Sequence, residues 1–459
     1  MIQIKAPDPA PRQTCPMSTA PTIRATAPRY TSYPPATAFS PVRETTDFEA
    51  ALSGLDPARP VSVYVHIPFC ERLCWFCACR TQGVRSLTPV TAYVETVLGE
   101  LALLRRHLPP DLRMGQLHFG GGTPTILPPA LIDRLTTALK ETFTPADRLQ
   151  FSVEIDPTLV DREKIEAFAR HGMTRASIGV QDFADEVQAA IGRPQPYSVT
   201  REAIRMLREA GVGSLNLDLV YGLPHQTART FGRTLDQVLS LDPDRLALFG
   251  YAHVPHVAKR QRLIPEHALP GDTGRTHLFQ QARDRFAAAR YVSLGIDHFG
   301  KPGDSLVTAA RSGGLRRNFQ GYTDDRCESL IGVGASAISR VGGFFHNATG
   351  TADYSKRIGE GRLATHRQHV WTGQDRLRAR AIEMLMCDFS IDLASLRRDC
   401  GPPEPILSDL ESAATLFHDA VTFDGRHFTL RPDHRGKVRL IAQALDQYDH
   451  SSATFSRVS

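Results

Sequence analysis

Six short runs of apolar, often β-branched residues recur between residues 61 and 253, and amphipathic stretches separate them. The runs are "VSVYVHI" (61–67), "QLHFG" (116–120), "LQFSVEI" (149–155), "RASIGV" (175–180), "SLNLDLVYG" (214–222) and "RLALFGYAH" (245–253). Helical spacing of apolar residues follows at 94–108, 129–143, 160–171, 198–210 and 230–240. Strands that alternate with helices predict an α/β fold with a parallel sheet, either a barrel-like (β/α)6 ring or an open doubly wound sheet.

The segments on either side of this core differ in composition. Residues 1–28 are rich in Pro, Thr and Ala without periodicity, so we expect an N-terminal arm over 1–45 and the barrel over 46–345. Beyond it, helical patterns at 374–387, 406–419 and 437–448 flank "VTFDGRHFTL" (421–430), which is typical of a hairpin with an Asp-Gly turn. A small, mostly helical C-terminal domain with a β-hairpin is therefore expected over 346–459.

Charge and hydropathy exclude several classes of partner. The 459 residues carry a formal net charge of +5, which is spread along the chain and too weak to indicate nucleic-acid binding. A winged-helix interpretation of the C-terminal domain lacks a basic recognition helix. No apolar run reaches the roughly 18 residues of a membrane span, and the N-terminus has no continuous apolar core. We expect a cytoplasmic protein without a nucleic-acid or membrane partner.

Cysteine is concentrated in one turn. Of eight cysteines, four lie within "CERLCWFCAC" (70–79), directly after the first predicted strand. Cys70, Cys74 and Cys77 have the spacing C-x3-C-x2-C. Three thiolates with an open fourth position favour an iron–sulfur cluster that binds a further ligand on its free iron. A zinc site stays open as an alternative, although no second pair of knuckle cysteines follows, and so does chance.

The same turn resembles the fingerprint of the radical S-adenosylmethionine (SAM) enzymes. Further blocks narrow the resemblance to the oxygen-independent coproporphyrinogen III oxidases of that superfamily, and they occur in the same order in this chain. They are "PRYTSYPPATAF" (28–39), "YVHIPFCERLCWFCAC" (64–79), "GGGTPT" (120–125), "EIDP" (154–157), "GVQDF" (179–183), "NLDLVYGLPHQ" (216–226), "YAHVP" (251–255), "GIDHFGKP" (295–302), "RNFQGYT" (317–323) and "GASAIS" (334–339). The resemblance implies a partial (β/α)6 radical SAM barrel with an N-terminal arm and the small C-terminal domain.

The resemblance also implies cofactors and their ligands. It implies a [4Fe–4S] cluster held by Cys70, Cys74 and Cys77, and two SAM molecules per chain. The residues that match SAM contacts are Tyr64, Phe76, Gly121, Gly122, Thr123, Glu154 and Ile338 for the cofactor on the cluster, with Gln181, Arg193, Asp218 and Ala252 for the second. Cys79 matches a cysteine that does not bind the cluster and acts in catalysis.

Each of these residues also has an ordinary structural interpretation. Cys79 alone would be read as a small buried residue, and Tyr64 as packing on an alternating strand. The glycines could form a plain strand-to-helix turn, in which glycine permits close approach of the backbone. Glu154 could be a carboxylate at a helix N-terminus.

The implied reaction is the oxidative decarboxylation of two propionates of coproporphyrinogen III to vinyl groups. Four arginines are candidates for the substrate carboxylates, namely Arg29, Arg311, Arg316 and Arg317, with a solvated basic face as the alternative. We expect His66 and His298 to be structural. The enzyme would act as a monomer with a flavodoxin- or ferredoxin-like electron donor.

Some residues depart from the family pattern, and related activities stay open. Trp75, Ala78 and Arg80 replace the usual residues beside the cysteines without replacing a ligand, and "DDRCES" (324–329) also differs. A heme chaperone and a heme-opening radical SAM methyltransferase are the alternatives within the superfamily. Such chaperones usually lack the counterpart of Cys79 and the PRYTSYP block, both of which are present here.

Overall fold

The computed structural model describes residues 27–42 and 44–448. Its main feature is a 13-stranded sheet with the order β1-β17-β16-β15-β14-β2-β5-β6-β7-β8-β9-β11-β10. The parallel part runs from β14 to β9, and it contains all six predicted strands, as β2 (Val61–Ile67), β5 (Arg113–Gly121), β6 (Thr144–Ile155), β7 (Met173–Gln181), β8 (Ser214–Tyr221) and β9 (Arg245–Gly250). The α/β prediction is confirmed, and no closed barrel forms among the described residues.

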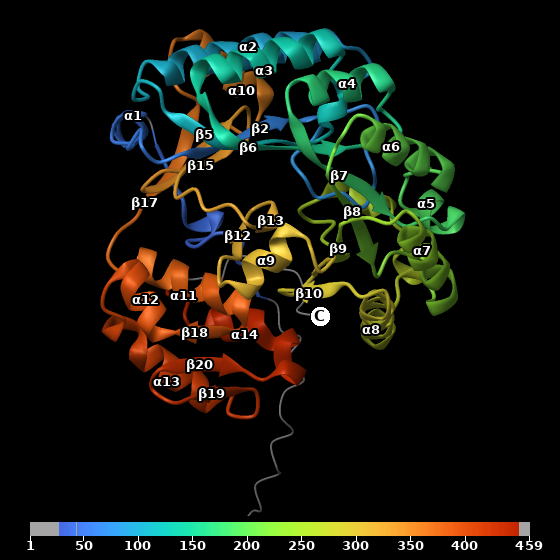
Figure 1. Ribbon diagram of the computed structural model, residues 1–459, viewed down its shortest axis with the longest axis vertical. Helices are drawn as coiled ribbons and strands as arrows, with labels where there is room; N and C mark the ends of the chain where they lie inside the picture. The colour runs from blue at the N-terminus through green and yellow to red at the C-terminus, as the bar shows by residue number, and fades with distance from the viewer. Residues whose placement is uncertain (1–26, 43, 449–459) are drawn as a thin grey trace, which may run out of the picture.

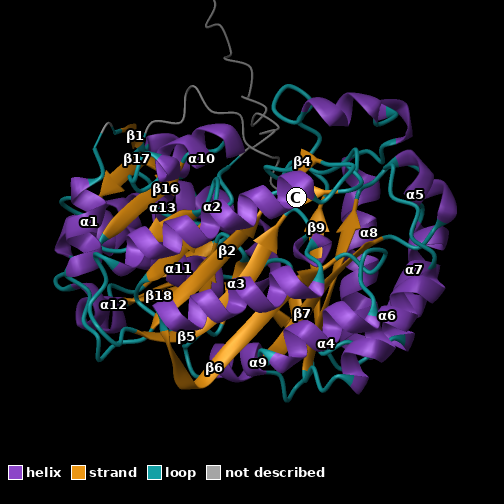
Figure 2. Cartoon of the chain, turned by 90° about the horizontal axis from the view of Figure 1, so that it is seen from above, coloured by secondary structure: helices purple, strands orange, loops and turns teal. Residues whose placement is uncertain are grey.

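Helices cover the outer face of this curved sheet (Figure 1). They are α1 (Thr46–Ser53), α2 (Thr88–Arg105), α3 (Pro129–Thr142), α4 (Arg162–Arg170), α5 (Asp185–Ala190), α6 (Tyr197–Glu209), α7 (Ala228–Ser240), α8 (Asp272–Ala288) and α10 (Thr351–Gly359). The short helix α9 (Ser305–Arg311) lies on the inner side of the curve, beside β12 (Arg316–Asn318) and β13 (Gly321–Thr323) (Figure 1). Figure 2 shows the strands inside the curve and α4 to α7 outside it. None of the helices in the described part of the chain has the length and apolar character that crossing a membrane requires.

Local sequence explains why these segments form helices and pack on the sheet. α7 begins with a capping box, in which the Thr227 side chain accepts a hydrogen bond from the main-chain N–H of Thr230. The apolar face of α4 places Phe168 against Phe119 and Phe151 of β5 and β6, with ring centroids 5.9 and 6.1 Å away. Burial of such aromatic clusters fixes the helix layer on the strands.

Short antiparallel strands extend both edges of the parallel region. β11 (His298–Gly300) and β10 (Val292–Leu294) follow β9 on one edge. On the other edge, β14 (Leu330–Val333) pairs parallel with β2, followed by β15 (Ile338–Arg340), β16 (Gly343–Asn347), β17 (Thr365–Val370) and β1 (Ser40–Pro41). The sequence patterns had not predicted these strands, since most are only two to five residues long. Two further strand pairs, β3 (Phe69–Cys70) with β4 (Gln82–Gly83) and β12 (Arg316–Asn318) with β13 (Gly321–Thr323), lie outside the large sheet.

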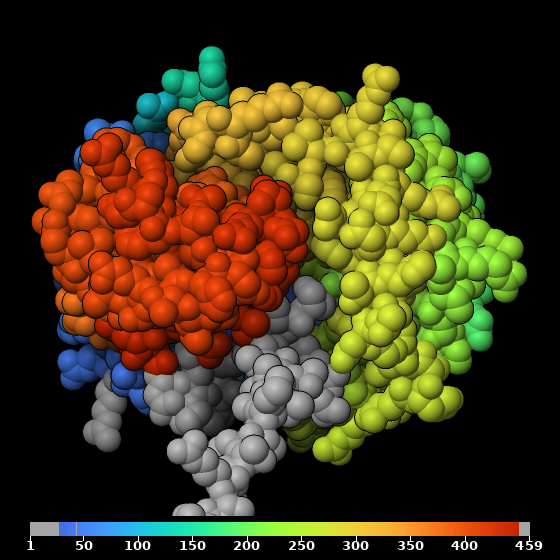
Figure 3. All heavy atoms as spheres, turned by 90° about the horizontal axis from the view of Figure 1, so that it is seen from below, coloured from blue at the N-terminus to red at the C-terminus, as the bar shows by residue number. Residues whose placement is uncertain are grey.

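A second hydrophobic core lies in the C-terminal part of the chain, which begins its own packing near Leu377. It contains α11 (Asp375–Asp388), α12 (Leu393–Cys400), α13 (Leu407–Leu416), α14 (Val438–Gln443) and the sheet β18 (Ser390–Asp392), β20 (His427–Leu430) and β19 (Val421–Phe423). The hairpin forms where it was predicted, and the last helix is shorter than expected. In Figure 3 this unit lies beside the segment that follows β9. We place the boundary between the two units after Val370, because β17 still pairs with the large sheet.

The N-terminal arm joins the two units. Tyr30 and Tyr33 belong to the second core, although they lie more than 340 residues before the helices they contact. The hydroxyl of Tyr30 donates to Asp446 Oδ2 at 3.0 Å, and the hydroxyl of Tyr33 accepts from the main chain of Gln447 at 3.2 Å. The predicted arm residues 1–26 lie outside the described residues.

Candidate functional site

A cavity of about 660 Å³ opens where the parallel strands end. Its walls include most of the site residues expected from the sequence, namely Cys70, Cys74, Phe76, Cys77, Cys79, Gly121, Gly122, Thr123, Glu154, Gln181, Arg193, Asp218 and Ala252. This agrees with the general position of active sites in parallel α/β folds, at the carboxyl ends of the strands.

Each of the three cysteine sulfurs in the fingerprint receives a hydrogen-bond donor. Thr123 Oγ1 lies 3.4 Å from Cys70 Sγ, and Arg193 Nη1 lies 3.3 Å from Cys74 Sγ. The main-chain N–H of Cys79 donates to Cys77 Sγ at 3.4 Å. Donors directed at sulfur stabilise thiolate charge, which is the form that binds metal. The residues therefore fit an iron–sulfur cluster, with the chemistry of the donor set as the evidence.

The protonation of the cysteines is strongly perturbed. The side chain of Cys79, the main-chain N–H of Cys79 and the guanidinium of Arg260 lower the pKa of Cys77 to about 6, although burial acts in the opposite direction. The same neighbour, Cys77, raises the pKa of Cys79. Burial raises the pKa of Cys70 to about 11. Of the pair at 77 and 79, Cys77 is thus the better thiolate, and Cys79 stays a thiol that is exposed at the cavity wall.

Backbone contacts hold the cysteine turn in place. A Cβ atom on Gly122 would lie 2.7 Å from the carbonyl oxygen of Phe69, so the end of β5 can approach this turn only as glycine. Gln261 Nε2 donates to the carbonyl of Phe76 at 2.8 Å and to that of Ala252 at 3.1 Å. The loop after β9 is thereby tied to the turn.

Glu154 lies at the end of β6 with both carboxylate oxygens engaged. Oε2 accepts from the main-chain N–H of Gly121 at 3.0 Å, and Oε1 lies 3.4 Å from His118 Nε2. Burial would raise the pKa of Glu154, but the hydrogen bonds from His118 and Gly121 lower it. The group is therefore an anion at neutral pH, and it suits hydroxyl or ammonium donors of a ligand.

Two strands further along the sheet, Asp218 of β8 accepts from Asn216 Nδ2 at 2.8 Å and Ser177 Oγ at 3.1 Å. Burial raises the pKa of Asp218 to about 6. Gln181 at the end of β7 has a positive φ of 67°, and it lines the same cavity.

Arg193 already has a full set of partners in this structure. Besides Cys74, it contacts Asp156 Oδ2 at 3.3 Å, Gln195 Oε1 at 3.0 Å and the carbonyl of Gly179 at 3.1 Å. Its predicted role at a second SAM molecule stays a prediction, and binding there would require an exchange of at least one of these partners.

Two of the expected residues do not line the large cavity. Tyr64 is buried beside it, where its hydroxyl lies 3.0 Å from His66 Nδ1 and its ring 4.7 Å from the ring of Phe319. Ile338 lines a neighbouring cavity of about 390 Å³. The two cavities share Phe319 and Leu330 in their walls, so Ile338 lies across this partition from the cysteine turn.

Several wall residues were missed in the sequence, namely His118, Ser177, Asn216, Phe319, Gln320, Asp297 and His298. A signal for some of them existed. Residues two apart on a strand face the same side, so Asn216 follows from Asp218. His298, which the sequence analysis treated as structural, contacts Asp297 Oδ1 through Nδ1 at 2.7 Å and faces the cavity.

Comparison with known proteins places this site in a family. Residues 64–238 match the radical SAM superfamily. The chain is 52% identical over 439 residues to an oxygen-independent coproporphyrinogen III oxidase of Cereibacter sphaeroides, covering 95% of this chain and 97% of that protein. The chain belongs to this family. An oxygen-independent coproporphyrinogen III oxidase of Paracoccus denitrificans is 46% identical, with 94% and 96% covered.

A solved structure of the family supports the fold as well. The coproporphyrinogen III oxidase of Escherichia coli, described as a radical SAM enzyme, superposes with a TM-score of 0.88 at 34% identity. The match covers 92% of this chain and 98% of that one. It therefore extends through the C-terminal unit, and the membership of this radical SAM oxidase family rests on nearly the whole chain.

Proposed function

We propose that this protein is an oxygen-independent coproporphyrinogen III oxidase, which converts two propionate side chains of coproporphyrinogen III to vinyl groups and so forms protoporphyrinogen IX in heme biosynthesis. The observation that carries the proposal is that Cys70, Cys74 and Cys77 line one cavity together with Gly121, Gly122 and Glu154. Each propionate loses carbon dioxide, one hydrogen atom and one electron, which leaves a carbon–carbon double bond.

The chemistry of bond cleavage would come from the bound groups, and the protein supplies position and environment. When bound, a [4Fe–4S] cluster and SAM would supply the radical chemistry needed to remove a hydrogen atom from the propionate. Cys70, Cys74 and Cys77 would hold the cluster, while Gly121, Gly122 and Thr123 would contact SAM beside it. Glu154 would accept from the ribose hydroxyls of SAM, and Phe76 would cover the cluster and exclude water.

The proposal also covers a second SAM molecule, two further contacts to the first one, and the setting in which the enzyme works. Gln181, Arg193, Asp218 and Ala252 would bind a second SAM molecule in the same cavity. Tyr64 and Ile338 would contact the first SAM molecule. The enzyme would act as a cytoplasmic monomer, and it would receive electrons from a flavodoxin- or ferredoxin-like protein.

Cys79 is proposed to act in catalysis without binding the cluster. Its exposure at the cavity wall supports access to the substrate.

The test is an anaerobic assay that follows tetrapyrrole mass and 5′-deoxyadenosine together, after reconstitution with iron and sulfide. We expect loss of two carboxyl groups with matching 5′-deoxyadenosine. Cys77→Ser should lose the cluster absorbance and SAM cleavage, whereas Cys400→Ser, a change in the C-terminal unit, should keep both. SAM cleavage without any change in tetrapyrrole mass would refute the assigned substrate.

Cys79→Ser separates the two cysteine roles. The variant should keep the iron content of the wild type and should lower turnover of coproporphyrinogen III. Loss of the cluster in this variant would show that Cys79 is a ligand.

A further inference from the structure

Arg317 is a buried cation that makes no ion-pair contact among the described residues, although the carboxylate of Asp297 is near enough to raise its pKa. It lies on β12 and is 8% exposed. Among the described residues, its Nε and Nη1 have no hydrogen-bond acceptor, and no carboxylate oxygen lies within 4.0 Å of a guanidinium nitrogen, the limit for an ion pair. Its guanidinium lies over the ring of Tyr322, 4.5 Å from the centroid. A buried charge that lacks a partner is costly, so this arrangement indicates an anionic ligand.

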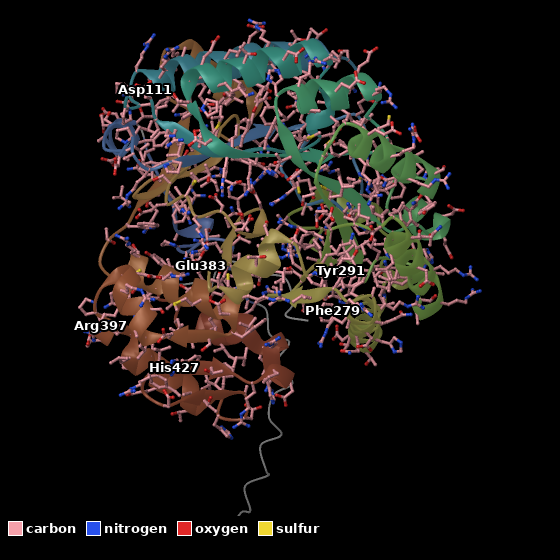
Figure 4. The ribbon with its side chains drawn as sticks, viewed as in Figure 1. Asp111, Phe279, Tyr291, Glu383, Arg397 and His427 are labelled. Carbon is pink, nitrogen blue, oxygen red and sulfur yellow. The ribbon has the colours of Figure 1, made fainter. Side chains whose placement is uncertain are left out.

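The position of Arg317 suits a ligand that reaches both cavities. Its side chain lines the cavity of about 660 Å³ and the neighbouring one of about 390 Å³. Glu383 Oε1 of α11 accepts from the main-chain N–H of Arg317 at 3.2 Å, and the Tyr322 hydroxyl donates to the carbonyl of Met386 at 2.7 Å. Figure 4 labels Glu383 on the side of the C-terminal unit nearest to these strands. β12 and β13 are thus fixed between the two units.

Arg29 reaches the large cavity from the N-terminal arm. Arg439 Nε of α14 donates to the carbonyl of Pro28 at 3.0 Å, and its Nη2 donates to that of Ala27. The arm is therefore held on both sides of Arg29, since Tyr30 is anchored in the second core. Arg29 itself is exposed and lines the cavity, with Nη2 3.5 Å from the carbonyl of Gly250.

The guanidiniums of Arg29 and Arg317 line the same large cavity, and both interact electrostatically with Asp297. Burial would raise the pKa of Asp297, but His298 lowers it, and Arg317 and Arg29 lower it further. Arg29 and Arg317 also lower the pKa of Arg439, after burial, to about 10. Arginines from segments nearly 290 residues apart in the chain thus line one cavity and act on the same carboxylate, that of Asp297.

The other two candidate arginines are placed differently. Arg316 Nη1 donates to the carbonyls of Gly313 and Leu315 at 3.2 and 3.0 Å, and its Nε lies 3.9 Å from Glu383 Oε2. Arg311 is exposed at the end of α9, and it lines neither cavity. The structure therefore distinguishes between four arginines that the sequence could not rank.

We propose that Arg317 and Arg29 form a carboxylate-binding subsite for a propionate of the tetrapyrrole that is not being oxidised. The inference rests on the proposed function for its substrate. Arg317 has two donors, Nε and Nη1, without a partner among the described residues, and a guanidinium forms strong hydrogen bonds with a carboxylate. Arg29 adds a second charge from the arm, and the bound carboxylate positions the opposite side chain near the cysteine turn.

The experiment compares binding of coproporphyrin III, an oxidised tetracarboxylate that cannot turn over, with binding of its tetramethyl ester. Fluorescence quenching of the porphyrin on the reconstituted holoenzyme gives both affinities. Hydrogen bonds to a charged group predict that Arg317→Gln weakens binding of the tetracarboxylate roughly 10- to 100-fold and leaves the ester unchanged. Arg317→Lys should restore part of the loss, and Arg311→Gln is the matched control with wild-type affinities.

Turnover of coproporphyrinogen III gives an independent measurement. Arg317→Gln should raise KM more than it lowers kcat, because the group binds a carboxylate away from the reacting carbon. The subsite would be overturned if Arg317→Gln still preferred the tetracarboxylate over the ester as strongly as the wild type does. It would also be overturned if the wild type bound acid and ester with equal affinity. If Arg317→Gln does not fold, Arg29→Gln carries the same comparison.

Failure of the proposed function is distinguishable from failure of the subsite. A wild-type enzyme that does not decarboxylate coproporphyrinogen III, but binds coproporphyrin III in an Arg317-dependent manner, would support the subsite and refute the reaction. An active wild-type enzyme with unaltered binding in both arginine variants would refute the subsite alone.

Discussion

Replacement of Glu100 by Gln tests how the protein holds the loop between β14 and β15. Glu100 on α2 is 2% exposed. Its carboxylate accepts from the main-chain N–H of Gly334, from Asn347 Nδ2 and from the Tyr354 hydroxyl, each at 2.7 Å. This loop leads to Ile338, which we propose as a SAM contact. Glu100 is therefore the point at which α2, β16 and α10 hold one edge of the site.

The expected loss of stability with rising pH follows from the ionisation of the buried Glu100 carboxyl. Burial raises the pKa of Glu100 from 4.5 to about 7, although its three hydrogen bonds lower it. Because the folded pKa is above the unfolded one, the stability contributed by the neutral form is present below about pH 4.5 and is lost as pH rises through 7. Between pH 5 and 8.5 the wild type should lose roughly 2 to 3 kcal/mol from this group, at about 1.4 kcal/mol per pKa unit.

Native-state hydrogen exchange, followed by mass spectrometry on peptides from residues 334–347, measures this loss in the holoenzyme. After correction for intrinsic exchange, the free energy of opening should fall with pH in the wild type, and this component should be absent from Glu100→Gln. Glu95→Gln is the control, since Glu95 lies on the same helix and pairs with Arg134 at the surface. Parallel pH dependence in wild type and Glu100→Gln would refute the reasoning.

Three further substitutions test the framework around the site. Asp304→Ala removes the carboxylate 2.7 Å from the buried Arg245 and, with it, the N-cap of α9, and it should cost about 3 to 5 kcal/mol in urea unfolding. The exposed Asp353→Ala should cost less than about 1 kcal/mol. Equal losses would contradict this. Thr227→Ala removes the cap of α7 and should cost about 1 kcal/mol, and no change in the unfolding midpoint would show that the cap is dispensable. Phe168→Ala opens a cavity between α4 and the sheet and should cost about 3 to 5 kcal/mol, while a loss below about 1 would imply that the core collapses around it.

The sequence predicted the parts of the fold that have a local period. The parallel strands are continuous apolar runs, and in the helices between them apolar residues recur every three to four positions. Both patterns can therefore be recognised without knowledge of neighbouring segments. The cysteine spacing has the same property, because Cys70, Cys74 and Cys77 lie within one turn. The antiparallel strands at the sheet edges were missed, since strands of two to five residues have too few positions to show a period.

The site combines both kinds of information. The positions of Glu154 and Asp218 at strand ends could be inferred from the sequence, because parallel strands bring their carboxyl ends to one edge. Their partners His118, Asn216 and Ser177 were not inferred, although two-residue alternation along a strand would have found some of them.

Contacts between segments that lie far apart in the chain could not be read from the sequence. Arg311, Arg316 and Arg317 look alike in sequence, and burial, free donors and the nearby arm separate them. The same holds for Ile338, which lies in the smaller cavity. Local patterns determine which elements form, whereas the electrostatic surroundings of a side chain depend on segments that meet only after folding. In this protein the sequence therefore determined the parallel strands and the cysteine turn, and the packing of the arm, the large sheet and the C-terminal unit determined which arginine is left without an ion-pair contact.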